Sequence, residues 1–292
     1  MKLAIIANPV AGRGKAYRRL KSLLDHWSDA NWEVELLTTR GPEHAGELAR
    51  ELAVTPPDLL AVCGGDGTIS EVASSLHPLP FPVAILPAGT ANVLAREFGI
   101  SHVPMRALEQ ALRGKPIRID SVRLSGRSNR RFLLMAGVGF DADVVARTSP
   151  LWKARIGMAA YVISVLSELL RYPFHEFRVI TENGSYSATS CIISNSRFYG
   201  SGMVFSPNAN PRDGELDLVL LEGNNRLAYL SFLISAQLRR PRDGPQVKRC
   251  RARAIRIEGP RGIWVQADGE LVGTLPVEMA ILPSSFPLVL PG

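Results

Sequence analysis

The stretch that decides the fold is Gly64-Gly65-Asp66-Gly67-Thr68, which follows an apolar run at residues 59–62 and precedes a segment with helical periodicity. A short apolar run ended by glycines predicts a buried strand. Glycines let the backbone approach phosphate oxygens closely, and a helix N-terminus adds positive partial charge. Asp66 is suited to hold Mg²⁺, and Thr68 to donate a hydrogen bond to phosphate. A glycine-rich turn with Asp66 as a helix cap is the structural alternative.

Two more glycine-bearing loops follow predicted strands. Residues 2–7 lead into Asn8-Pro9-Val10-Ala11-Gly12-Arg13-Gly14-Lys15, and residues 83–86 lead into Pro87-Ala88-Gly89-Thr90-Ala91-Asn92. Helical segments between the strands, such as residues 15–27, predict a parallel sheet covered on both faces. Ligands of such sheets bind beyond the carboxyl ends of the strands. Three such loops therefore predict a polyphosphate site, although G-x-x-x-x-G-K-[ST] of a Walker A loop is absent.

The pattern changes near Pro116. Many short strand-like segments follow, among them residues 131–136 and 277–282 and a last one at about residues 286–290. Turn pairs such as Asn183-Gly184 separate them, and helical segments at residues 153–170 and 227–238 interrupt them. Many strands with turn chemistry predict an antiparallel sandwich. The predicted fold class is therefore α/β plus β. A parallel α/β domain spans residues 1–120 plus about 285–292, a β-sandwich domain with inserted helices spans residues 121–284, and the active site lies in the cleft between them.

Composition limits the kinds of partner. The chain is 46% hydrophobic and 21% charged, which argues against disorder, and its net charge of +7 favours anionic partners. No basic–aromatic motif of a nucleic-acid binder is present, so we predict no nucleic-acid partner. The apolar stretch at residues 156–170 contains Glu168 and is shorter than the roughly 20 residues that span a bilayer. Three cysteines without a C-x-x-C pair fit a reducing cytoplasm.

The motifs, taken together, resemble a known family. N-P-V-A-G-R-G-K, G-G-D-G-T-I-S-E-V and L-P-A-G-T-A-N resemble the diacylglycerol kinase catalytic domain, as found in bacterial soluble lipid kinases. Farther along, residues 194–203, the D-G-E-L-D run at 213–217 and the D-G-E run at 268–270 resemble elements of the same family. The resemblance covers nearly the whole chain, and it implies transfer of a phosphoryl group from ATP to the hydroxyl of diacylglycerol or a related lipid.

The resemblance also implies roles for individual residues. The implied catalytic residues are Asp66, Asp268 and Glu270, with Asp268 or Glu270 as the base. The implied nucleotide-binding residues are Asn8, Pro9, Val10, Ala11, Gly12, Thr39, Gly65, Asp66, Gly67, Thr68, Glu71 and Thr90. A structural Mg²⁺ in the second domain would take the carboxylate of Asp213 and main-chain oxygens of Asn210 and Glu215.

This chain departs from the family pattern at two positions. Ser70 stands where the family often has Asn, and Val93 stands where it often has an Asp that would join Asp66 in a magnesium network. Val93 therefore favours one alternative, a nucleotide-binding regulator with degraded catalysis, whereas the intact Asp268 and Glu270 oppose it. A kinase of a soluble acceptor such as NAD is the other alternative, because such enzymes share a G-G-D-G loop.

The expected ligands are ATP, Mg²⁺ and a lipid at a membrane surface, and the expected location is the cytoplasm, at the inner membrane face. We expect docking on anionic membranes through the second domain. Basic residues flank its two helical segments: Arg147, Lys153, Arg155, Arg239, Arg240, Arg242, Lys248, Arg249, Arg251 and Arg253. No oligomeric state is predicted.

Overall fold

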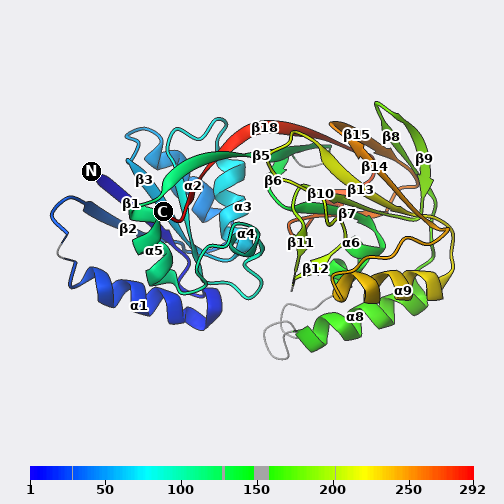
Figure 1. Ribbon diagram of the computed structural model, residues 1–292, viewed down its shortest axis with the longest axis horizontal. Coiled ribbons are helices and arrows are strands. Elements are labelled where there is room, and N and C mark those ends of the chain that lie inside the picture. The colour runs from blue at the N-terminus through cyan, green and yellow to red at the C-terminus, as the bar shows by residue number, and fades with distance from the viewer. Residues whose placement is uncertain (28, 127–128, 148–157, 201) are drawn as a thin grey trace. The chain divides into compact units, whose positions relative to one another are not determined.

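A computed structural model describes residues 1–27, 29–126, 129–147, 158–200 and 202–292 (Figure 1). The chain divides into two compact units, Met1–Ser121 with Pro283–Gly292, and Val122–Leu282. The functions that we assign to the two predicted domains stay predictions. Lys153, Arg155 and the start of the predicted helix at residues 153–170 lie outside the described residues.

The first unit is built on a parallel sheet with the strand order β2-β1-β3-β4. Its strands are β1 (Lys2–Ala7), β2 (Glu33–Thr38), β3 (Leu59–Gly64) and β4 (Val83–Pro87). Residues 3–7 and 59–64 are buried throughout, as expected for central strands that helices cover on both faces. The helices are α1 (Lys15–Leu24), α2 (His44–Leu52), α3 (Asp66–Ser75), α4 (Val93–Glu97) and α5 (Pro104–Leu112). Helix α1 packs on α5, and α2 on α3 (Figure 1).

The register of these strands places their carboxyl ends at one edge. Ala7 pairs with Thr38 and with Cys63, and Gly64 pairs with Pro87. The loops that begin at Asn8, Gly65 and Ala88 therefore start side by side, and this edge holds the site described below.

Helix α1 is shorter than the helix predicted at residues 15–27. It ends at Leu24, and the N–H groups of His26 and Trp27 donate to the carbonyls three residues earlier, at 3.0 and 3.1 Å. Residues in this tightened last turn keep the apolar spacing of an α-helix, although the α-helix itself ends at Leu24. Periodicity alone therefore overestimates the length of the helix.

The second unit is a β-sandwich with helices on one side. One sheet has the order β14-β13-β10-β7-β16-β17, and its strands are β14 (Val247–Ala252), β13 (Leu216–Leu221), β10 (Ser190–Ser194), β7 (Met135–Gly139), β16 (Trp264–Ala267) and β17 (Glu270–Thr274). The facing strands include β5 (Lys115–Ser125), β6 (Arg130–Phe132), β8 (Phe177–Thr181), β9 (Gly184–Ala188), β15 (Ala254–Glu258) and β18 (Val277–Leu290). The short strands β11 (Phe198–Tyr199) and β12 (Met203–Val204) pair with each other.

Strand β10 shows how the two core clusters of this unit arise. Cys191 and Ile193 point into the sandwich core, whereas Ile192 joins a second cluster with the helices α6 (Phe140–Arg147), α8 (Met158–Arg171) and α9 (Arg226–Gln237). Because both faces are covered, the strand is buried throughout, and its central residues are apolar on both faces rather than alternating. A parallel sheet in the first unit and an antiparallel sandwich in the second confirm the predicted fold class.

Strand β18 joins two segments that we predicted as separate strands, residues 277–282 and 286–290. It pairs with β15 through Val277–Ala280 and with β4 through Leu288. Between them Ser284 takes a φ of 51°, and its N–H donates to Oδ1 of Asp120 at 2.7 Å. The Asp120 side chain thus accepts the hydrogen bond of the N–H group at the kink, so the strand bends instead of ending. Among the described helices, none is long and apolar enough to cross a membrane.

Candidate functional site

The loops after β1, β3 and β4 are joined by backbone hydrogen bonds. The N–H of Asn8 donates to the carbonyl of Cys63 at 2.8 Å, and the N–H of Ala88 donates to the carbonyl of Gly64 at 2.8 Å. Nδ2 of Asn8 donates to Oγ1 of Thr68 at 3.3 Å, which links the first loop to helix α3. The structure therefore brings together the three loops that we singled out in the sequence.

Glycines make this close approach possible. A Cβ atom on Gly89 would lie 2.6 Å from Cα of Gly65, and one on Gly12 would overlap the carbonyl oxygen of Ala88. Gly12 also has a φ of 55°, which side-chain-bearing residues rarely adopt. The result is a cradle of backbone at the N-terminus of α3, a site with the chemistry that phosphate needs.

Asp66 is bound to the third loop. Its Oδ1 accepts the N–H of Leu94 at 3.3 Å, at the start of the short helix α4. Burial raises the pKa of Asp66, and the N–H groups of Val93, Leu94 and Asn92 oppose that shift. The carboxylate therefore caps α4, which sequence reasoning did not predict. Val93 contributes only its N–H here, because its side chain is buried in the core.

The other predicted nucleotide-binding residues are placed as follows. Pro9, Val10 and Ala11 lie in the first loop, Gly67 in the first turn of α3, and Thr90 is exposed in the third loop. Thr39 is buried directly after β2 and donates its N–H to the carbonyl of Ala7 at 2.9 Å. Oε2 of Glu71 accepts the N–H of Ala45 at 3.1 Å, so Glu71 anchors the start of α2.

In the second unit, Asp268 and Gly269 form the hairpin turn between β16 and β17. Their φ values of 48° and 85° are both positive, as in the tight turns that match strand twist. The Asp268 carboxylate accepts the N–H groups of Leu133, Leu134 and Met135 at 3.0, 3.0 and 3.1 Å. These bonds divide the strand predicted at residues 131–136 into β6 and β7, because the amides between them bind the carboxylate instead of a neighbouring strand.

Glu270 has a different environment. Its Oε2 lies 2.8 Å from Nη1 of Arg130, and its side chain is 45% exposed. The two predicted catalytic carboxylates thus share a turn, but backbone amides hold one and the partly exposed side chain of Arg130 pairs with the other.

The residues predicted to hold a structural Mg²⁺ form a hydrogen-bonded turn. The carbonyl of Asn210 accepts the N–H groups of Arg212 and Asp213 at 2.7 and 3.3 Å. Oδ1 of Asp213 accepts the N–H of Glu215 at 3.1 Å. The Asn210 carbonyl and Oδ1 of Asp213, two of the oxygens that would bind the ion, therefore accept hydrogen bonds within the turn itself.

Arg251 places a guanidinium among the carboxylates of this turn. It pairs with Asp213, with Glu215 at 2.7 Å (Nη1 to Oε2) and with Asp217 at 3.6 Å (Nε to Oδ2). Within the described part of the chain, no group of three or more His, Cys, Asp or Glu side chains is arranged to hold a metal ion. Arg251 therefore supplies positive charge beside Asp213 and Glu215, and the Mg²⁺ site stays a prediction. Sequence reasoning missed this, although Asp217 and Arg251 are direct cross-strand partners of β13 and β14.

Comparison with known proteins agrees with both halves of this geometry. A model described as "Diacylglycerol kinase catalytic domain" matches residues 2–124, and one described as "YegS C-terminal NAD kinase beta sandwich-like domain" matches residues 135–290. The chain belongs to this family of lipid kinases. The resemblance identified from its motifs is therefore confirmed.

Relatives of this chain match along most of their length. A diacylglycerol kinase of Mycobacterium tuberculosis is 29% identical over 99% of this chain and 95% of its own. A probable lipid kinase YegS of Escherichia coli is 30% identical over 84% of this chain and 81% of its own. A crystal structure of a diacylglycerol kinase from Bacillus anthracis has a TM-score of 0.74 at 21% identity, covering 99% of this chain and 96% of that one, and it supports the fold alone.

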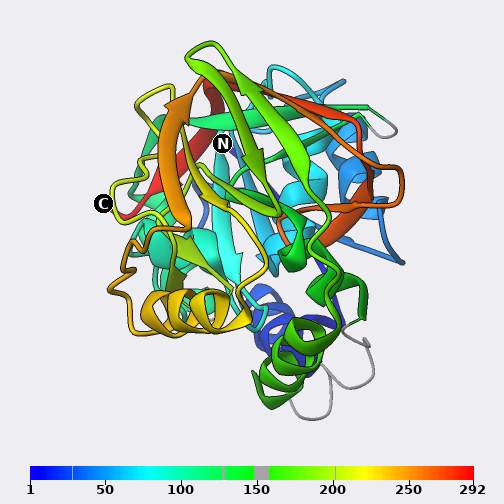
Figure 2. The ribbon, with the colours of Figure 1, turned by 90° about the vertical axis from the view of Figure 1, so that its right-hand side faces the viewer.

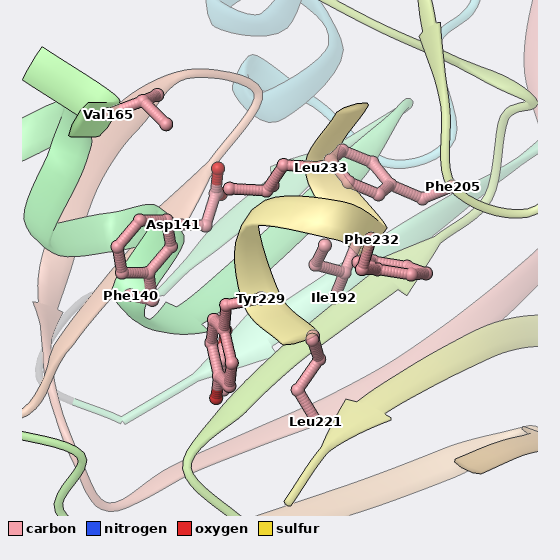
Figure 3. Close-up of a pocket in the computed structure, with 10 residues that line it drawn as sticks. Phe140, Asp141, Val165, Ile192, Phe205, Leu221, Tyr229, Phe232 and Leu233 are labelled. Atoms are coloured by element: carbon pink, nitrogen blue, oxygen red, sulfur yellow. The ribbon is translucent and has the colours of Figure 1, made fainter. Parts of the chain in front are cut away.

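The second unit also contains a small pocket between α9 and the sheet. Phe140, Ile192, Tyr229 and Phe232 line it, together with Asp141 (Figure 3). Its volume of about 10 Å³ is that of roughly one water molecule. In this conformation the pocket is too small for an acyl chain, so we assign no lipid site to it.

Proposed function

We propose that this chain is an ATP-dependent lipid kinase that phosphorylates the hydroxyl of diacylglycerol or a related lipid. The observation that carries the proposal is the packing of Gly12 on Ala88 and of Gly65 on Gly89, which forms a cradle of backbone from three loops. Membership in a lipid kinase family supports the class of acceptor. We place its activity in the cytoplasm, where ATP is available.

The first unit would bind and orient the nucleotide. Mg²⁺-ATP, when bound, supplies the phosphoryl group and neutralises charge on its phosphates. The N–H groups at the start of α3 and the glycine loops face the phosphates, and Asn8 and Thr68 fix the loops relative to each other. We retain Pro9, Val10, Ala11, Thr39, Glu71 and Thr90 as proposed contacts or supports, and Asp66 as the residue that fixes the third loop.

The second unit would supply the base. As the lipid oxygen bonds to the γ-phosphorus, the bond from that phosphorus to ADP breaks and the hydroxyl loses its proton. We propose Asp268 for that proton, because three backbone amides fix the direction of its carboxylate. Glu270 is held by Arg130 on the surface, and we propose that it supports the turn.

A phosphorylation assay tests this function. Purified protein with labelled Mg²⁺-ATP should phosphorylate diacylglycerol in mixed micelles and leave NAD unlabelled. Labelling of NAD instead would support the soluble-acceptor alternative, which shares the NAD kinase-like description of the second domain. Nucleotide binding without turnover across a lipid panel would support a regulator with degraded catalysis, as the buried Val93 allows.

We further propose that the enzyme docks on anionic membranes through α8 and α9, which lie side by side (Figure 2). Tyr229, Phe232 and Ala236 turn one face of α9 into the core. Leu227 and Leu238 are 78% and 68% exposed on another face, with Ile234 between them. Leu166 and Leu170 of α8 are exposed as well. Apolar side chains on an exposed helical stripe suit the boundary between headgroups and acyl chains.

Charge at the end of α9 supports an anionic surface as the partner. Arg240 and Arg242 are exposed and have no carboxylate partner among the described residues. The basic residues of β14 differ, because Lys248 pairs with Glu222 at 2.7 Å and Arg249 with Asp243 at 2.7 Å. The docking charge is therefore smaller than the sequence indicates.

Vesicle co-sedimentation tests the docking face. We expect the wild type to bind anionic vesicles more than neutral ones, and Leu227→Ser with Leu238→Ser, or Arg240→Ser with Arg242→Ser, to weaken binding about 10-fold. Val54→Ser is the matched control, because Val54 is 87% exposed but lies in the first unit. Equal binding of neutral and anionic vesicles, or equal loss in the control, would rule out this face.

A further inference from the structure

Asp141 is a buried carboxylate in the second unit whose role no motif indicated. It lies at the start of α6, is 6% exposed, and accepts two hydrogen bonds. The hydroxyl of Tyr199 donates to Oδ1 at 2.9 Å, and Nε2 of Gln266 donates to Oδ2 at 2.6 Å. Both donors are neutral, so the carboxylate is buried without an ion pair from either, a costly arrangement.

The backbone leaves room for this carboxylate. A Cβ atom on Gly137 would overlap Oδ2 of Asp141 and would lie 2.9 Å from Nε2 of Gln266. A glycine in the middle of β7 weakens a strand and often marks a close approach. The absence of a side chain at Gly137 therefore leaves room for the contact between Asp141 and Gln266.

The ionised carboxylate determines which way the Gln266 amide faces. A carboxylate only accepts hydrogen bonds, so the NH₂ group of Gln266 must point to Asp141. The carbonyl end, Oε1, is then directed away, and it accepts the N–H of Gly269 at 2.8 Å. Gly269 is the middle residue of the Asp268-Gly269-Glu270 turn. The orientation of the buried Gln266 amide therefore affects the turn that carries the proposed base, Asp268.

We infer that Asp141 is a positioning residue for this turn: through Gln266 it holds the Gly269 N–H, and thereby fixes the Asp268 carboxylate for the acceptor hydroxyl. This inference rests on the proposed function, in which Asp268 takes the proton. The turn is then held from two sides, by the amides of residues 133–135 on Asp268 and by Gln266 on Gly269.

Exchange of the two side chains is the sharpest test. Gln266→Glu places two carboxylates against each other, and Asp141→Asn places two NH₂ groups against each other in the orientation that keeps the bond from the Tyr199 hydroxyl. The double variant restores every bond: Nδ2 of the new Asn donates to the new Glu, whose other oxygen accepts the Gly269 N–H, while Oδ1 still accepts from Tyr199. We expect each single variant to lower kcat about 10- to 100-fold with the KM for ATP unchanged, and the double variant to return to within about threefold of wild type.

Tyr172→Phe is the control for loss of a buried hydrogen bond. The hydroxyl of Tyr172 donates to the carbonyl of Thr189 at 2.7 Å in the neighbouring core cluster, but not to the turn. We expect this variant to lower the Tm and to leave kcat near the wild-type value. An equal loss of kcat in this control would show that any buried hydrogen bond has the same effect, and it would overturn the inference.

Amide hydrogen exchange at Gly269 gives a readout that does not depend on activity. Spectra of protein labelled with ¹⁵N-glycine contain signals from only 25 glycines, so the Gly269 amide can be followed. Exchange should be faster in either single variant and slow again in the double variant. If the wild type phosphorylates no lipid, the proposed function fails, but this measurement still tests the inference. Unchanged Gly269 exchange in Gln266→Glu, or a double variant no better than the single variants, would overturn it.

Discussion

Gly89 lies so close to Gly65 that a Cβ atom added to Gly89 would lie 2.6 Å from the Gly65 Cα. The two residues belong to the loops after β4 and β3, so a single methyl group would separate two walls of the proposed phosphate cradle. In the proposed function, ATP binding therefore requires that position 89 carries no side chain.

We therefore expect Gly89→Ala to weaken ATP binding about 10-fold or more, because the loop must shift away from Gly65. Calorimetric titration with Mg²⁺-ATP measures the effect. Gly41→Ala is the matched control, since a Cβ atom there would contact nothing within 4 Å. Equal ATP affinity in the two variants would refute the cradle.

Asp66→Ala should lower kcat about 100-fold or more, because it removes a charged group next to the phosphate loops. It should also lower the free energy of unfolding by about 1 kcal/mol, since Asp66 caps α4. Steady-state kinetics and urea unfolding measure the two effects separately. A folded variant with nearly normal kcat would leave Asp66 as a cap only.

Asp268→Asn should reduce kcat about 100-fold, and Glu270→Gln less than about 10-fold, with the KM for ATP unchanged in both. The difference follows from their surroundings, since amides fix Asp268 and a surface arginine pairs with Glu270. Kinetics with both variants at matched protein stability provide the check. The reverse order of effects would make Glu270 the base.

Removal of Mg²⁺ with a chelator should leave the Tm of the nucleotide-free wild type unchanged, because Arg251 already neutralises Asp213 and Glu215. Arg251→Met should lower the free energy of unfolding by about 1–2 kcal/mol and make the Tm rise with added Mg²⁺. Thermal melts of both proteins across a magnesium titration are the measurement. A wild-type Tm that rises with Mg²⁺ would restore the metal site first predicted from the sequence.

Burial raises the pKa of Asp141 from 3.8 to about 6, with Tyr199 and Gln266 opposing the shift. The native state therefore keeps this proton to a higher pH than the unfolded state. The contribution of the protonated Asp141 to the free energy of unfolding is complete below the pKa that Asp141 has in the unfolded chain. This contribution is lost as the pH rises through about 6. Over this window the wild type should lose about 3 kcal/mol relative to Asp141→Asn, which does not titrate. Urea unfolding of both proteins at about pH 4 and about pH 7 tests this, and a difference that is independent of pH would contradict it.

Several features of the fold and the site followed from the sequence. The runs at residues 59–62 and 83–86, each followed by a loop that contains glycine, identified parallel strands and their loops. They could be recognised because the tendency to form a strand and the backbone freedom of glycine are local properties. Element ends were less certain: the predicted helix at residues 15–27 ends at Leu24, and the strand predicted at residues 131–136 is interrupted by the Asp268 carboxylate.

What the sequence by itself determined was the order of the elements, the glycine loops on one sheet edge and the family. Only the tertiary structure decided which partner each charged side chain takes. Asp66 caps α4, Glu71 anchors α2, Arg251 pairs with carboxylates of the turn that was predicted to hold a metal ion, and Asp141 reaches the Asp268 turn through Gln266. The reason is that apolar period and turn chemistry are local properties, whereas a hydrogen bond or ion pair can join residues far apart in the sequence. Asp141 and Gln266 are 125 positions apart, and only the folded chain brings them together.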